Sequence, residues 1–488
     1  MNTKQKHVLV LVNTQLWELF HAESIEICLR HVSNGDKVVV AYCDGALAAC
    51  APNAKHIPEV CIKCRHISDH MRFLLAKHGI DFTALNLESS YPYVKDLDFT
   101  FESNDDLARI TYNEMPIGLL AASQIIDNCN DVYFSIKDQA SLAQNLIKSG
   151  IMLYEWVCSY AKEKSITDIY VWNGRRPCDG PAIYAAQSLN LNAYSYICGS
   201  RPESINISLS AAGQYPKAIN HNKQLHCSRA IEEIGKKEVM KRGLRYYRAY
   251  SMGKTSGVGS REAIKRYCRL KRFSATDYPM LNLKKPILLV LTSSPSESYF
   301  MTEYYAAFGS DPHGHYMSIF SNALILDKYN VIVRWHPAHL DAGSNERKRI
   351  NQCMVDYKEY CHIPPDSAVD TYTMLDYCDV VATQGSTLGW YASIRGIPVI
   401  VYGPFSLLAG NSVYGFNSKC ELLELLAQDS IPSLPYQDAL LLGHYLMNHG
   451  ENMNYVNPSH ITDDFAYNWH ISSNGNKMPI HPVFDQAA

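Results

Sequence analysis

Three loops in the second half of the chain carry residues suited to holding an anion. They are Thr292–Glu297 (TSSPSE), Arg334–Pro337 (RWHP) and Thr383–Gly389 (TQGSTLG). Small hydroxyl residues and a glycine at a helix start expose N–H groups and the positive end of the helix dipole, which favours phosphate. One such loop by itself is usually only a helix cap. All three follow apolar runs of strand length, so together they predict a phosphate site.

Within these loops, His336 is the residue best suited to chemistry. It can donate a hydrogen bond or a proton to a leaving phosphate, and the next residue, Pro337, would stiffen its backbone. The structural alternative is a His-Pro pair that only shapes a turn. The candidate phosphate-site residues around it are Ser293, Ser294, Glu297, Arg334, Pro337, Gly385, Ser386, Thr387 and Gly389.

The elements that must position these loops read as two α/β domains. In the first half, strands are expected at 7–12, 37–43 and 169–172, with helices up to Gly35 and at 117–126, 141–163 and 181–189. In the second half, strands are expected at 286–291, 331–335, 379–382 and 399–402, with helices at 316–328 and from Thr387. Strands alternating with helices predict parallel sheets, whose ligands bind beyond the carboxyl ends of the strands.

The expected domain boundaries follow shifts in composition. An α/β domain spans 1–215, a Lys-, Arg- and Tyr-rich helical connector spans 216–285, and the phosphate-site domain spans 286–430. The tail, 431–488, is expected to pack back on the first domain. The connector could also touch anionic lipid and so place a lipid-linked acceptor near the site, although a solvated helix surface explains its charge equally.

The stretch from Ile287 to Tyr414 resembles the capsule polysaccharide biosynthesis family, which includes bacterial Kdo transferases. The resemblance is carried by the loops above and by Asp370-Thr371-Tyr372, Cys378–Val381 and Gly396–Ile400. It implies two Rossmann-like domains of GT-B type facing a cleft, no catalytic metal, and a nucleotide-sugar donor bound mainly by the second domain. In the family, the His-Pro pair and the Ser-Thr pair engage a CMP-linked donor. One departure is Tyr391, which stands where the family often has Glu.

The resemblance thus implies an inverting glycosyltransferase that builds capsule or lipopolysaccharide from a CMP-linked acidic sugar such as Kdo or another nonulosonate. Its acceptor would be a glycan or a lipid-linked glycan. Three alternatives stay open at this point: a nucleotide-diphosphate-sugar donor, a CDP-alcohol phosphotransferase of teichoic-acid type, and a non-catalytic assembly protein.

Inverting transfer also requires a general base, which the first domain should supply. Glu23 on the first helix is the preferred candidate, with His21 and Glu26 beside it. A solvated helix face is the structural alternative for these acids. Asn173 and Arg175, in a turn after a strand, are candidates for binding the acceptor's carboxylate or phosphate, although a structural ion pair explains Arg175 equally.

Four cysteines, Cys43, Cys50, Cys61 and Cys64, fall within a short stretch and could hold a structural zinc ion. Ordinary reduced thiols are the simpler interpretation. His21-Ala22-Glu23 followed by Cys61-x-x-Cys64 also approaches the zinc deaminase signature, but the proline expected directly before the first cysteine is Val60.

Composition limits the classes of partner. Apolar residues make up 47% of the 488 residues and charged residues 19%, which is ample for packed cores. A formal net charge of -3 argues against nucleic acid as a partner. No apolar run approaches the roughly 20 residues of a membrane span, and the start of the chain does not resemble a signal peptide. We therefore expect a cytoplasmic protein that binds the inner membrane face at most peripherally.

Overall fold

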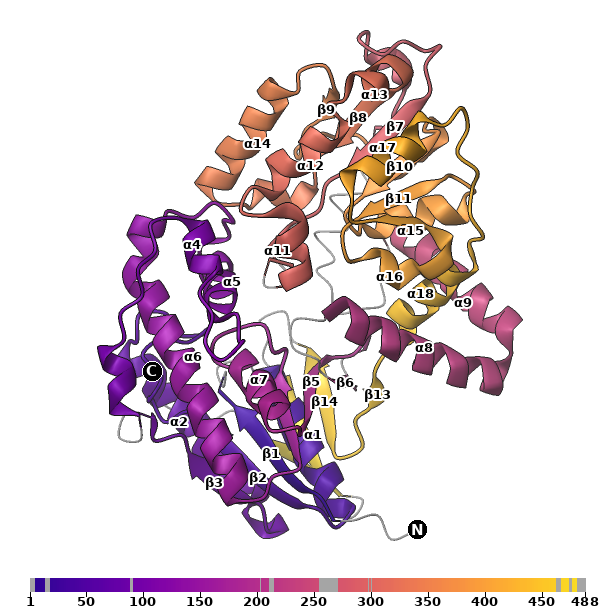
Figure 1. Ribbon diagram of the computed structural model, residues 1–488. Helices are drawn as coiled ribbons and strands as arrows, with labels where there is room; N and C mark the ends of the chain where they lie inside the picture. The colour runs from indigo at the N-terminus through magenta and orange to yellow at the C-terminus, as the bar shows by residue number, and fades with distance from the viewer. Residues whose placement is uncertain are drawn as a thin grey trace. The chain divides into compact units, whose positions relative to one another are not determined.

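The computed structural model describes residues 5–13, 18–87, 91–201, 203–209, 215–253, 271–296, 298–299, 301–461, 467–473 and 476–480. The chain forms two compact units (Figure 1). Unit 1 comprises Met1–Asn128, Ser135–Ala212 and Gly450–Ala488, and unit 2 comprises Cys129–Phe134 and Gly213–His449. Each unit is built around its own largely parallel sheet.

The sheet of unit 1 has the strand order β13-β6-β5-β4-β1-β2-β3. Its strands are β1 (His7–Val12), β2 (Lys37–Tyr42), β3 (Asp81–Ala84), β4 (Asp168–Trp172), β5 (Asn192–Cys198), β6 (Ser204–Leu209) and β13 (Glu451–Asn452). The strands from β3 to β5 pair in parallel, and β6 and β13 pair antiparallel at the edge. The parallel order 3-2-1-4-5 is that of a Rossmann-like sheet.

Helices cover this sheet because its strands are apolar on both faces. Val8 and Val10 of β1 pack in one buried cluster with Ile25 of α1, while Leu9 and Leu11 are buried on the other face. The described helices of unit 1 are α1 (Glu18–Ser33), α2 (Pro58–Leu75), η1 (Ala76–His78), η2 (Pro92–Asp96), α4 (Asn104–Ala108), α5 (Ile117–Cys129), α6 (Ile136–Glu163) and α7 (Gly180–Ser188). The predicted strand–helix alternation of the first half is confirmed.

The sheet of unit 2 has the order β12-β11-β10-β7-β8-β9, and every pairing is parallel. Its strands are β7 (Ile287–Leu291), β8 (Asn330–Arg334), β9 (Cys361–Ile363), β10 (Val380–Thr383), β11 (Val399–Tyr402) and β12 (Tyr414–Phe416). Numbered from β7, this is the Rossmann order 3-2-1-4-5-6, in which the order of strand addition reverses between β7 and β10 while all strands stay parallel. The expectation of two Rossmann-like domains is confirmed.

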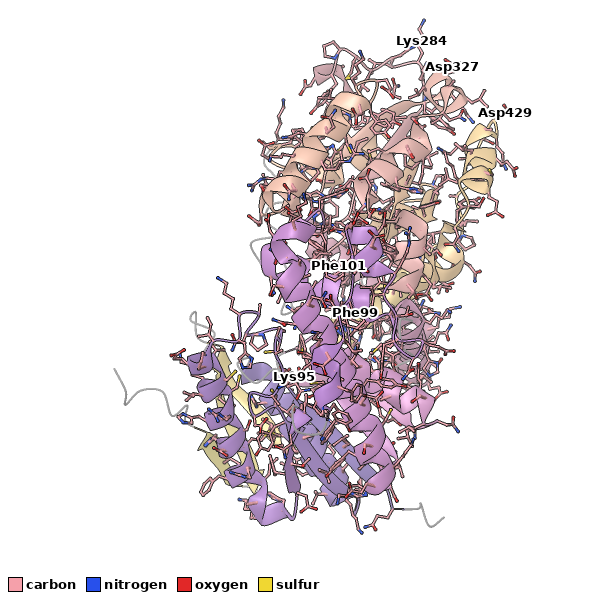
Figure 2. All side chains as sticks on the ribbon, turned by 60° about the vertical axis from the view of Figure 1, so that its left-hand side comes forward. Lys95, Phe99, Phe101, Lys284, Asp327 and Asp429 are labelled. Carbon is pink, nitrogen blue, oxygen red and sulfur yellow. The ribbon has the colours of Figure 1, made fainter. Side chains whose placement is uncertain are left out.

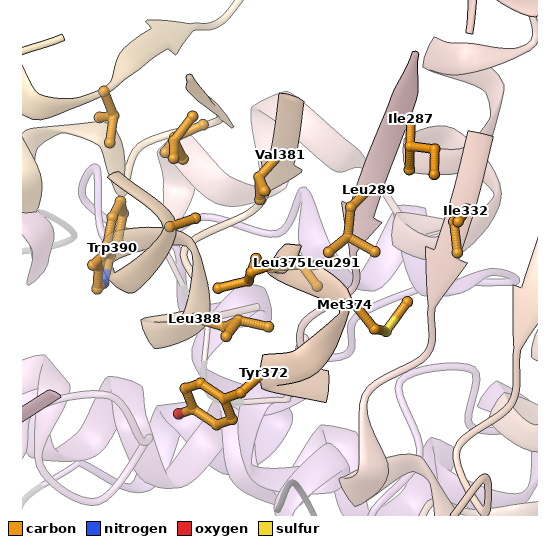
Figure 3. Close-up of a cluster of buried hydrophobic side chains, with 14 of the residues drawn as sticks. Ile287, Leu289, Leu291, Ile332, Tyr372, Met374, Leu375, Val381, Leu388 and Trp390 are labelled. Atoms are coloured by element: carbon orange, nitrogen blue, oxygen red, sulfur yellow. The ribbon is translucent and has the colours of Figure 1, made fainter. Parts of the chain in front are cut away.

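Alternate residues of β7 point into two different cores of unit 2. Ile287, Leu289 and Leu291 face a cluster that includes Leu388 and Trp390 of α15 (Figure 3). Leu288 and Val290 face the cluster formed with the helices on the opposite side. This burial on both faces keeps the strand ends, and therefore the loops that follow them, in fixed positions.

The described helices of unit 2 include two that lie in the expected connector, α8 (Tyr215–Ile234) and α9 (Lys236–Ser251). They belong to unit 2 and do not form a separate body. The others are η3 (Ala275–Asp277), α11 (Thr302–Phe308), α12 (Pro312–Phe320), α13 (Ala323–Lys328), η4 (Pro337–Leu340), α14 (Ser344–Asp356), η5 (Thr371–Asp376), α15 (Thr387–Ile394), α16 (Ser406–Ala409), η6 (Gly410–Ser412), α17 (Lys419–Ala427) and α18 (Gln437–Asn448).

Two expectations differ from the structure in detail. The helix expected over 316–328 is interrupted, because Asn322 accepts a hydrogen bond from the Leu324 N–H and so starts a new helix, α13. The tail expected from 431 is also divided: α18 packs on α9 within unit 2, and the chain from Gly450 belongs to unit 1. That last part forms the antiparallel strands β14 (Val456–Ile461), β15 (Tyr467–Ser473) and β16 (Asn476–Ile480).

The amino ends of the unit 2 strands carry exposed charges. Lys284 precedes β7 and Asp327 precedes β8, and both lie with Asp429 at the same end of unit 2 (Figure 2). The ligand-binding loops of such a sheet lie at the other end, beyond the carboxyl ends of the strands. Within the described part of the chain, no helix combines the length and the apolar character needed to span a bilayer.

Candidate functional site

A cavity of about 580 Å³ lies in unit 2 at the carboxyl ends of β7, β8 and β10. Its walls are the loops that follow these three strands, together with Asn130 and residues of η5. Because β7 and β10 flank the point where the strand order reverses, this is the place where open α/β sheets bind ligands. The three loops chosen from the sequence therefore meet in one site.

Hydroxyl and amide groups dominate the lining of this cavity. The contributing side chains are Ser293, Ser294, Ser296, Ser298, Gln384, Ser386 and Thr387. Gln384 Oε1 accepts the Ser293 N–H at 3.3 Å, which fixes the side-chain amide and joins the loop after β7 to the loop after β10. Among the described lining residues there is no Lys or Arg, so charge on a ligand would be stabilised by dipoles.

His336 is held by its backbone and by one ring nitrogen. Thr292 Oγ1 accepts the His336 N–H at 2.8 Å, and His336 Nδ1 accepts the Ala338 N–H at 3.2 Å as the N-cap of η4. An accepting Nδ1 places the ring proton on Nε2. Burial, together with the neighbouring His339 and Arg334, lowers the pKa of His336 to about 3. His336 is therefore a neutral ring that offers an N–H donor at physiological pH.

The start of α15 differs from the expected cradle of free backbone N–H groups. Thr383 Oγ1 accepts the N–H groups of Gly385 at 3.2 Å and Ser386 at 2.9 Å, and Ser386 Oγ accepts the Leu388 N–H as N-cap. The Ser386 hydroxyl hydrogen and the Thr387 hydroxyl remain to face the cavity. The donors at this helix start are thus mainly side-chain hydroxyls, which the local capping bonds hold in place.

Gly385 itself lines the cavity and has a φ of +138°, a conformation that favours glycine. A Cβ at this position would lie 2.9 Å from the Phe405 side chain, which closes the same wall. The glycine is therefore required both for the turn and for close packing.

Three predicted phosphate-site residues lie behind the cavity wall. Arg334 is 2% exposed, and its guanidinium donates to Thr371 Oγ1 at 3.1 Å and to the Pro364 carbonyl. Pro337 is buried at the start of η4. Gly389 packs α15 against β10, where an added Cβ would lie 2.7 Å from Thr383 Cγ2. These three residues are not among the described residues that line the cavity, and their contacts support the loops. Glu297 lies outside the described residues.

Sequence reasoning missed the inner wall, where His339 and Glu346 meet His313. Glu346 Oε1 lies 3.0 Å from His313 Nε2 and 3.2 Å from His339 Nδ1. Although burial opposes it, hydrogen bonds from these two histidines hold the pKa of Glu346 at about 2. Burial lowers the pKa of His339 to about 4, despite its hydrogen bond to Glu346. The wall is therefore an ionised carboxylate between two imidazole N–H donors.

The segment Cys129–Phe134 completes this wall. Asp131 accepts the N–H groups of Asn345 at 2.9 Å and Glu346 at 3.1 Å at the start of α14, and the Val132 N–H donates to Glu346 Oε2 at 3.2 Å. Asn130 lines the cavity directly. This segment lies far from α14 in sequence, so no local pattern could have revealed its role.

Aromatic side chains also line the cavity. Tyr250, Tyr372 and Phe405 contribute to it. Tyr391, which stands where the resembled family often has Glu, lies behind Tyr372 with ring centroids 5.5 Å apart and also stacks with Tyr247. Tyr391 is therefore part of the aromatic packing behind this side of the cavity.

In unit 1, α1 carries the three residues proposed for the base. Glu23 is fully buried, neither carboxylate oxygen has a hydrogen-bond partner among the described residues, and burial raises its pKa well above the ordinary value. Glu26 instead accepts the N–H groups of residues 454, 455 and 456 and pairs with Arg30 at 2.7 Å. Glu26 is therefore committed to holding the returning chain. His21 is buried in the same helix.

The turn after β4 holds the two predicted acceptor residues. Asn173 adopts a φ of +57° and donates its N–H to Tyr196 O at 3.0 Å. Arg175 donates to both oxygens of Asp127 at 3.1 and 3.0 Å, and Arg176 shares the same carboxylate. The structural ion pair considered for Arg175 is thus present, and it is made by one terminal nitrogen of the guanidinium group.

The cysteine cluster does not form a ligand set. Cys43, Cys50, Cys61 and Cys64 form no disulfide with any described cysteine, and burial raises the pKa of Cys43 and, more strongly, of Cys50. Among the described residues, His313, His339 and Glu346 are the only group whose ligand atoms all lie within 4.8 Å of one another. Neither the four cysteines nor the deaminase-like set of His21 with Cys61 and Cys64 converges to that extent.

No protein-family model matches the chain, and no curated protein matches it. Solved structures that match include KpsC β-Kdo 2,4 transferase of Thermosulfurimonas dismutans (13% identity, TM-score 0.34, 64% of this chain and 85% of that one). The KpsC β-Kdo 2,7 transferase of the same organism also matches (15%, 0.29, 67% and 85%).

A UDP-N-acetylglucosamine 2-epimerase from Neisseria meningitidis bound to UDP-GlcNAc matches as well (11% identity, TM-score 0.25, 91% of this chain and 96% of that one). At such identities and TM-scores, the assignment of this chain rests on its own strand order and site. That site is a hydroxyl-rich cavity at the switch point of a Rossmann-like sheet.

Proposed function

We propose that the cavity of unit 2 binds the phosphate of a nucleotide-activated sugar, and that the protein is an inverting, metal-independent glycosyltransferase of bacterial capsule or lipopolysaccharide synthesis. The observation that carries this proposal is the neutral His336 ring, fixed as an N–H donor among hydroxyl groups at the switch point. Such a constellation stabilises charge that develops on a leaving phosphate.

In the proposed reaction, an acceptor hydroxyl attacks the anomeric carbon of the donor sugar from the face opposite the phosphate. The new glycosidic C–O bond forms as the bond between the anomeric carbon and the phosphate oxygen breaks. The electron pair of the broken bond stays on the phosphate oxygen. His336 Nε2–H and the hydroxyls of Ser386 and Thr387 would donate hydrogen bonds to the negative charge that develops there. A base removes the acceptor proton, so no redox step or further reactant is required.

The charge of the cavity favours a donor with one phosphate. No described lining residue is a Lys or Arg, while Asp341 and Glu346 both line the cavity. A diphosphate brings more negative charge than hydroxyls and a neutral imidazole compensate readily. We therefore favour a CMP-linked sugar, whose single phosphate carries one negative charge, over a nucleotide-diphosphate sugar. That the sugar is acidic, such as Kdo or another nonulosonate, is inferred from the family resemblance and not from the charge of the cavity.

We assign the acceptor and the base to unit 1. Glu23 remains the candidate base, because Glu26 is committed to backbone contacts. Its raised pKa requires that substrate binding restore the ionised form before it can accept a proton. In unit 2, the exposed Lys237, Lys241 and Arg248 of α9 would suit contact with anionic lipid that carries a lipid-linked glycan acceptor. Co-sedimentation of the protein with vesicles of anionic lipid tests whether α9 binds a membrane surface.

The first test is nucleotide binding by the purified protein. Thermal unfolding is followed with CMP, CDP, UMP, UDP, GDP and ADP; a ligand at 100 times its Kd adds about 2.7 kcal/mol of stability. We expect stabilisation by CMP, its loss in His336→Ala, and its retention in the control His315→Ala, an exposed histidine of α12. Stabilisation only by a nucleoside diphosphate would mean that the donor is a nucleotide-diphosphate sugar and not a CMP-linked sugar. If no nucleotide stabilises the protein, the proposal is wrong.

The second test is product analysis with a nonulosonate donor. A glycosidic product with release of CMP from a CMP-sugar supports transfer. A phosphodiester product formed from a CDP-linked donor would instead identify a phosphotransferase. Firm nucleotide binding without any product or donor hydrolysis would identify a binding protein.

A further inference from the structure

A second cavity, of about 480 Å³, lies in unit 2 between α8, α16, η6 and α18. Helix α8 packs against both α16 and α18 (Figure 1). This α8 cavity shares no described lining residue with the candidate site. Phe405 lines the candidate site, whereas its neighbours Ser406 and Leu407 line the α8 cavity. The volume of the α8 cavity is typical of sites for small molecules.

One face of α8 lines this cavity with mostly polar side chains. The lining residues recur at the spacing of a single helix face, and they are Asn220, Lys223, Gln224, Cys227, Ser228 and Ile231. A helix that packs on a protein normally turns its apolar side chains inward and its polar ones to solvent. In α8, however, Leu225 is 46% exposed while Lys223 is only 6% exposed. The polar inner face therefore indicates that the cavity holds a polar ligand.

Several polar groups of the lining are available to such a ligand. The side chains of Gln224, Ser228 and Ser406 make no hydrogen bond to any described residue. Gln224 and Ser228 are exposed and Ser406 is half-buried, so a ligand in the cavity can reach them. The exposed Asn411 donates its N–H and Nδ2–H to Asp438 Oδ2 at 2.9 and 3.3 Å, which holds its side-chain amide in place. The cavity therefore offers both donors and acceptors.

The charges of the described lining cancel each other. The cation is Lys223 and the anion is Asp438. Lys223 Nζ donates to the Leu408 carbonyl at 2.6 Å, and burial lowers the pKa of Lys223 although the charge of Asp438 opposes this shift. An ion in the cavity would be attracted by one of the two charges and repelled by the other. The lining therefore favours a neutral ligand.

The chemistry of the lining further narrows the class of neutral ligand. A purely apolar ligand would displace water from the amides and hydroxyls without replacing its hydrogen bonds, which is costly. A hydroxyl both donates and accepts, so it can pair with a serine, with an amide N–H or with an amide oxygen. Beside these groups, Ile231, Leu407 and Leu441 offer apolar surface to C–H groups. A sugar ring combines such hydroxyls with such C–H groups.

We propose that the α8 cavity is a second carbohydrate site, which binds a neutral sugar unit of a glycan through Gln224, Ser228, Ser406 and Asn411. The proposal rests on the proposed function only for the source of the sugar, which is the glycan that serves as acceptor or product. Because the two cavities share no lining residue, the sugar unit in the α8 cavity is not the unit that is transferred.

Binding of simple sugars to the full-length protein provides the test. Saturation-transfer NMR is recorded with the methyl glycosides of glucose, galactose, rhamnose and N-acetylglucosamine as neutral probes, and with the methyl glycoside of Kdo as an acidic probe. We expect saturation transfer to at least one neutral glycoside. If no probe receives saturation, or if only the acidic probe does, the proposed neutral sugar site is wrong.

Substitutions locate the bound glycoside. Gln224→Leu and Ser406→Ala each remove hydrogen-bonding groups from the lining and should weaken binding about five-fold, the loss of one hydrogen bond. The control is Gln428→Leu, because Gln428 is exposed and lines neither cavity. Equal affinities of Gln224→Leu, Ser406→Ala and Gln428→Leu would place the glycoside elsewhere and overturn the proposal.

CMP separates this site from the candidate site. We expect the glycoside to bind with the same affinity in saturating CMP and in His336→Ala. Displacement of the glycoside by CMP would place it in the candidate site and overturn the second site. If the wild-type protein binds no nucleotide, the proposed function fails, whereas glycoside binding that depends on Gln224 still supports the α8 cavity.

Discussion

The hydroxyl of Thr292 accepts the backbone N–H of His336 at 2.8 Å and lies 3.3 Å from the Arg334 carbonyl, to which it donates. One side chain at the end of β7 thus fixes the direction in which the chain leaves β8. The His336 ring accepts a second hydrogen bond from the Ala338 N–H. The two hydrogen bonds together fix the direction of the His336 Nε2–H. Thr292 is a positioning residue for the candidate site.

Replacing Thr292 by Val tests this relationship. Thr292→Val keeps the shape of the side chain but leaves the His336 N–H unpaired. We expect a loss of about 1–3 kcal/mol in the free energy of unfolding in urea and weaker CMP binding. Thr292→Ser retains the oxygen and should bind CMP as wild type. Equal stability and affinity of the Val and Ser variants would show that the bond has no role.

The two cavity histidines, His339 buried and His336 partly exposed, are expected to make the stability of the protein depend on pH. The pKa values of His336, about 3, and His339, about 4, lie below the ordinary value, so the unfolded chain binds protons more readily than the folded one. Their contribution is complete above pH 6.5 and is lost as the pH falls toward these values. Each histidine should cost about 2 kcal/mol between pH 6.5 and pH 5.

The measurement is urea unfolding at pH 7 and pH 5. The fall in unfolding free energy should be smaller in His336→Asn than in wild type, and unchanged in the control His66→Asn, an exposed histidine of α2. If His336→Asn and wild type lose the same free energy between the two pH values, His336 is not held neutral by the fold.

Replacing Gly389 by Ala should create a steric clash, and a second substitution, Thr383→Ser, should relieve it. In Gly389→Ala the new Cβ would lie 2.7 Å from Thr383 Cγ2, and such overpacking costs about 1–3 kcal/mol. Thr383→Ser removes Cγ2 but keeps the oxygen that binds Gly385 and Ser386. A double-mutant cycle of unfolding free energies should show recovery in the double variant. Strictly additive losses would contradict the contact.

Two glutamates on the same helix should respond oppositely to amide substitution. Glu26→Gln weakens the contacts to residues 454–456 and Arg30 and should cost about 2–3 kcal/mol. Glu23 has a raised pKa, so ionisation favours the unfolded chain and stability is lost as the pH rises above the ordinary value. Glu23→Gln should therefore be neutral or stabilising at pH 8.

Unfolding free energies at pH 5 and pH 8 check this pair, with transfer activity as a further readout. Loss of activity in Glu23→Gln with intact stability would support its role as the base. A stability loss in Glu23→Gln equal to that in Glu26→Gln would show that Glu23 is a paired, ionised residue.

Local pattern was sufficient for the elements and for part of the site. Apolar runs such as Ile287–Leu291 and His7–Val12 became buried strands, because a strand covered on both faces must be apolar throughout. Parallel strands bring the residues that follow them to one edge, which is why Ser293, His336 and Ser386 meet. For Gly389 and Arg334, the same pattern could not distinguish a ligand contact from a support behind the wall.

Short-range periodicity and turn chemistry predict the order of strands and helices. They also place the hydroxyl residues and His336 after the ends of strands. Contacts between segments far apart in the chain bring Glu346, His339 and Tyr304 to the same cavity as the distant Asn130. The tertiary structure also decided that Glu26 caps a returning chain while Glu23 stays unpaired. Burial and hydrogen-bond polarity arise from contacts between segments far apart in the chain, so no local pattern contains them.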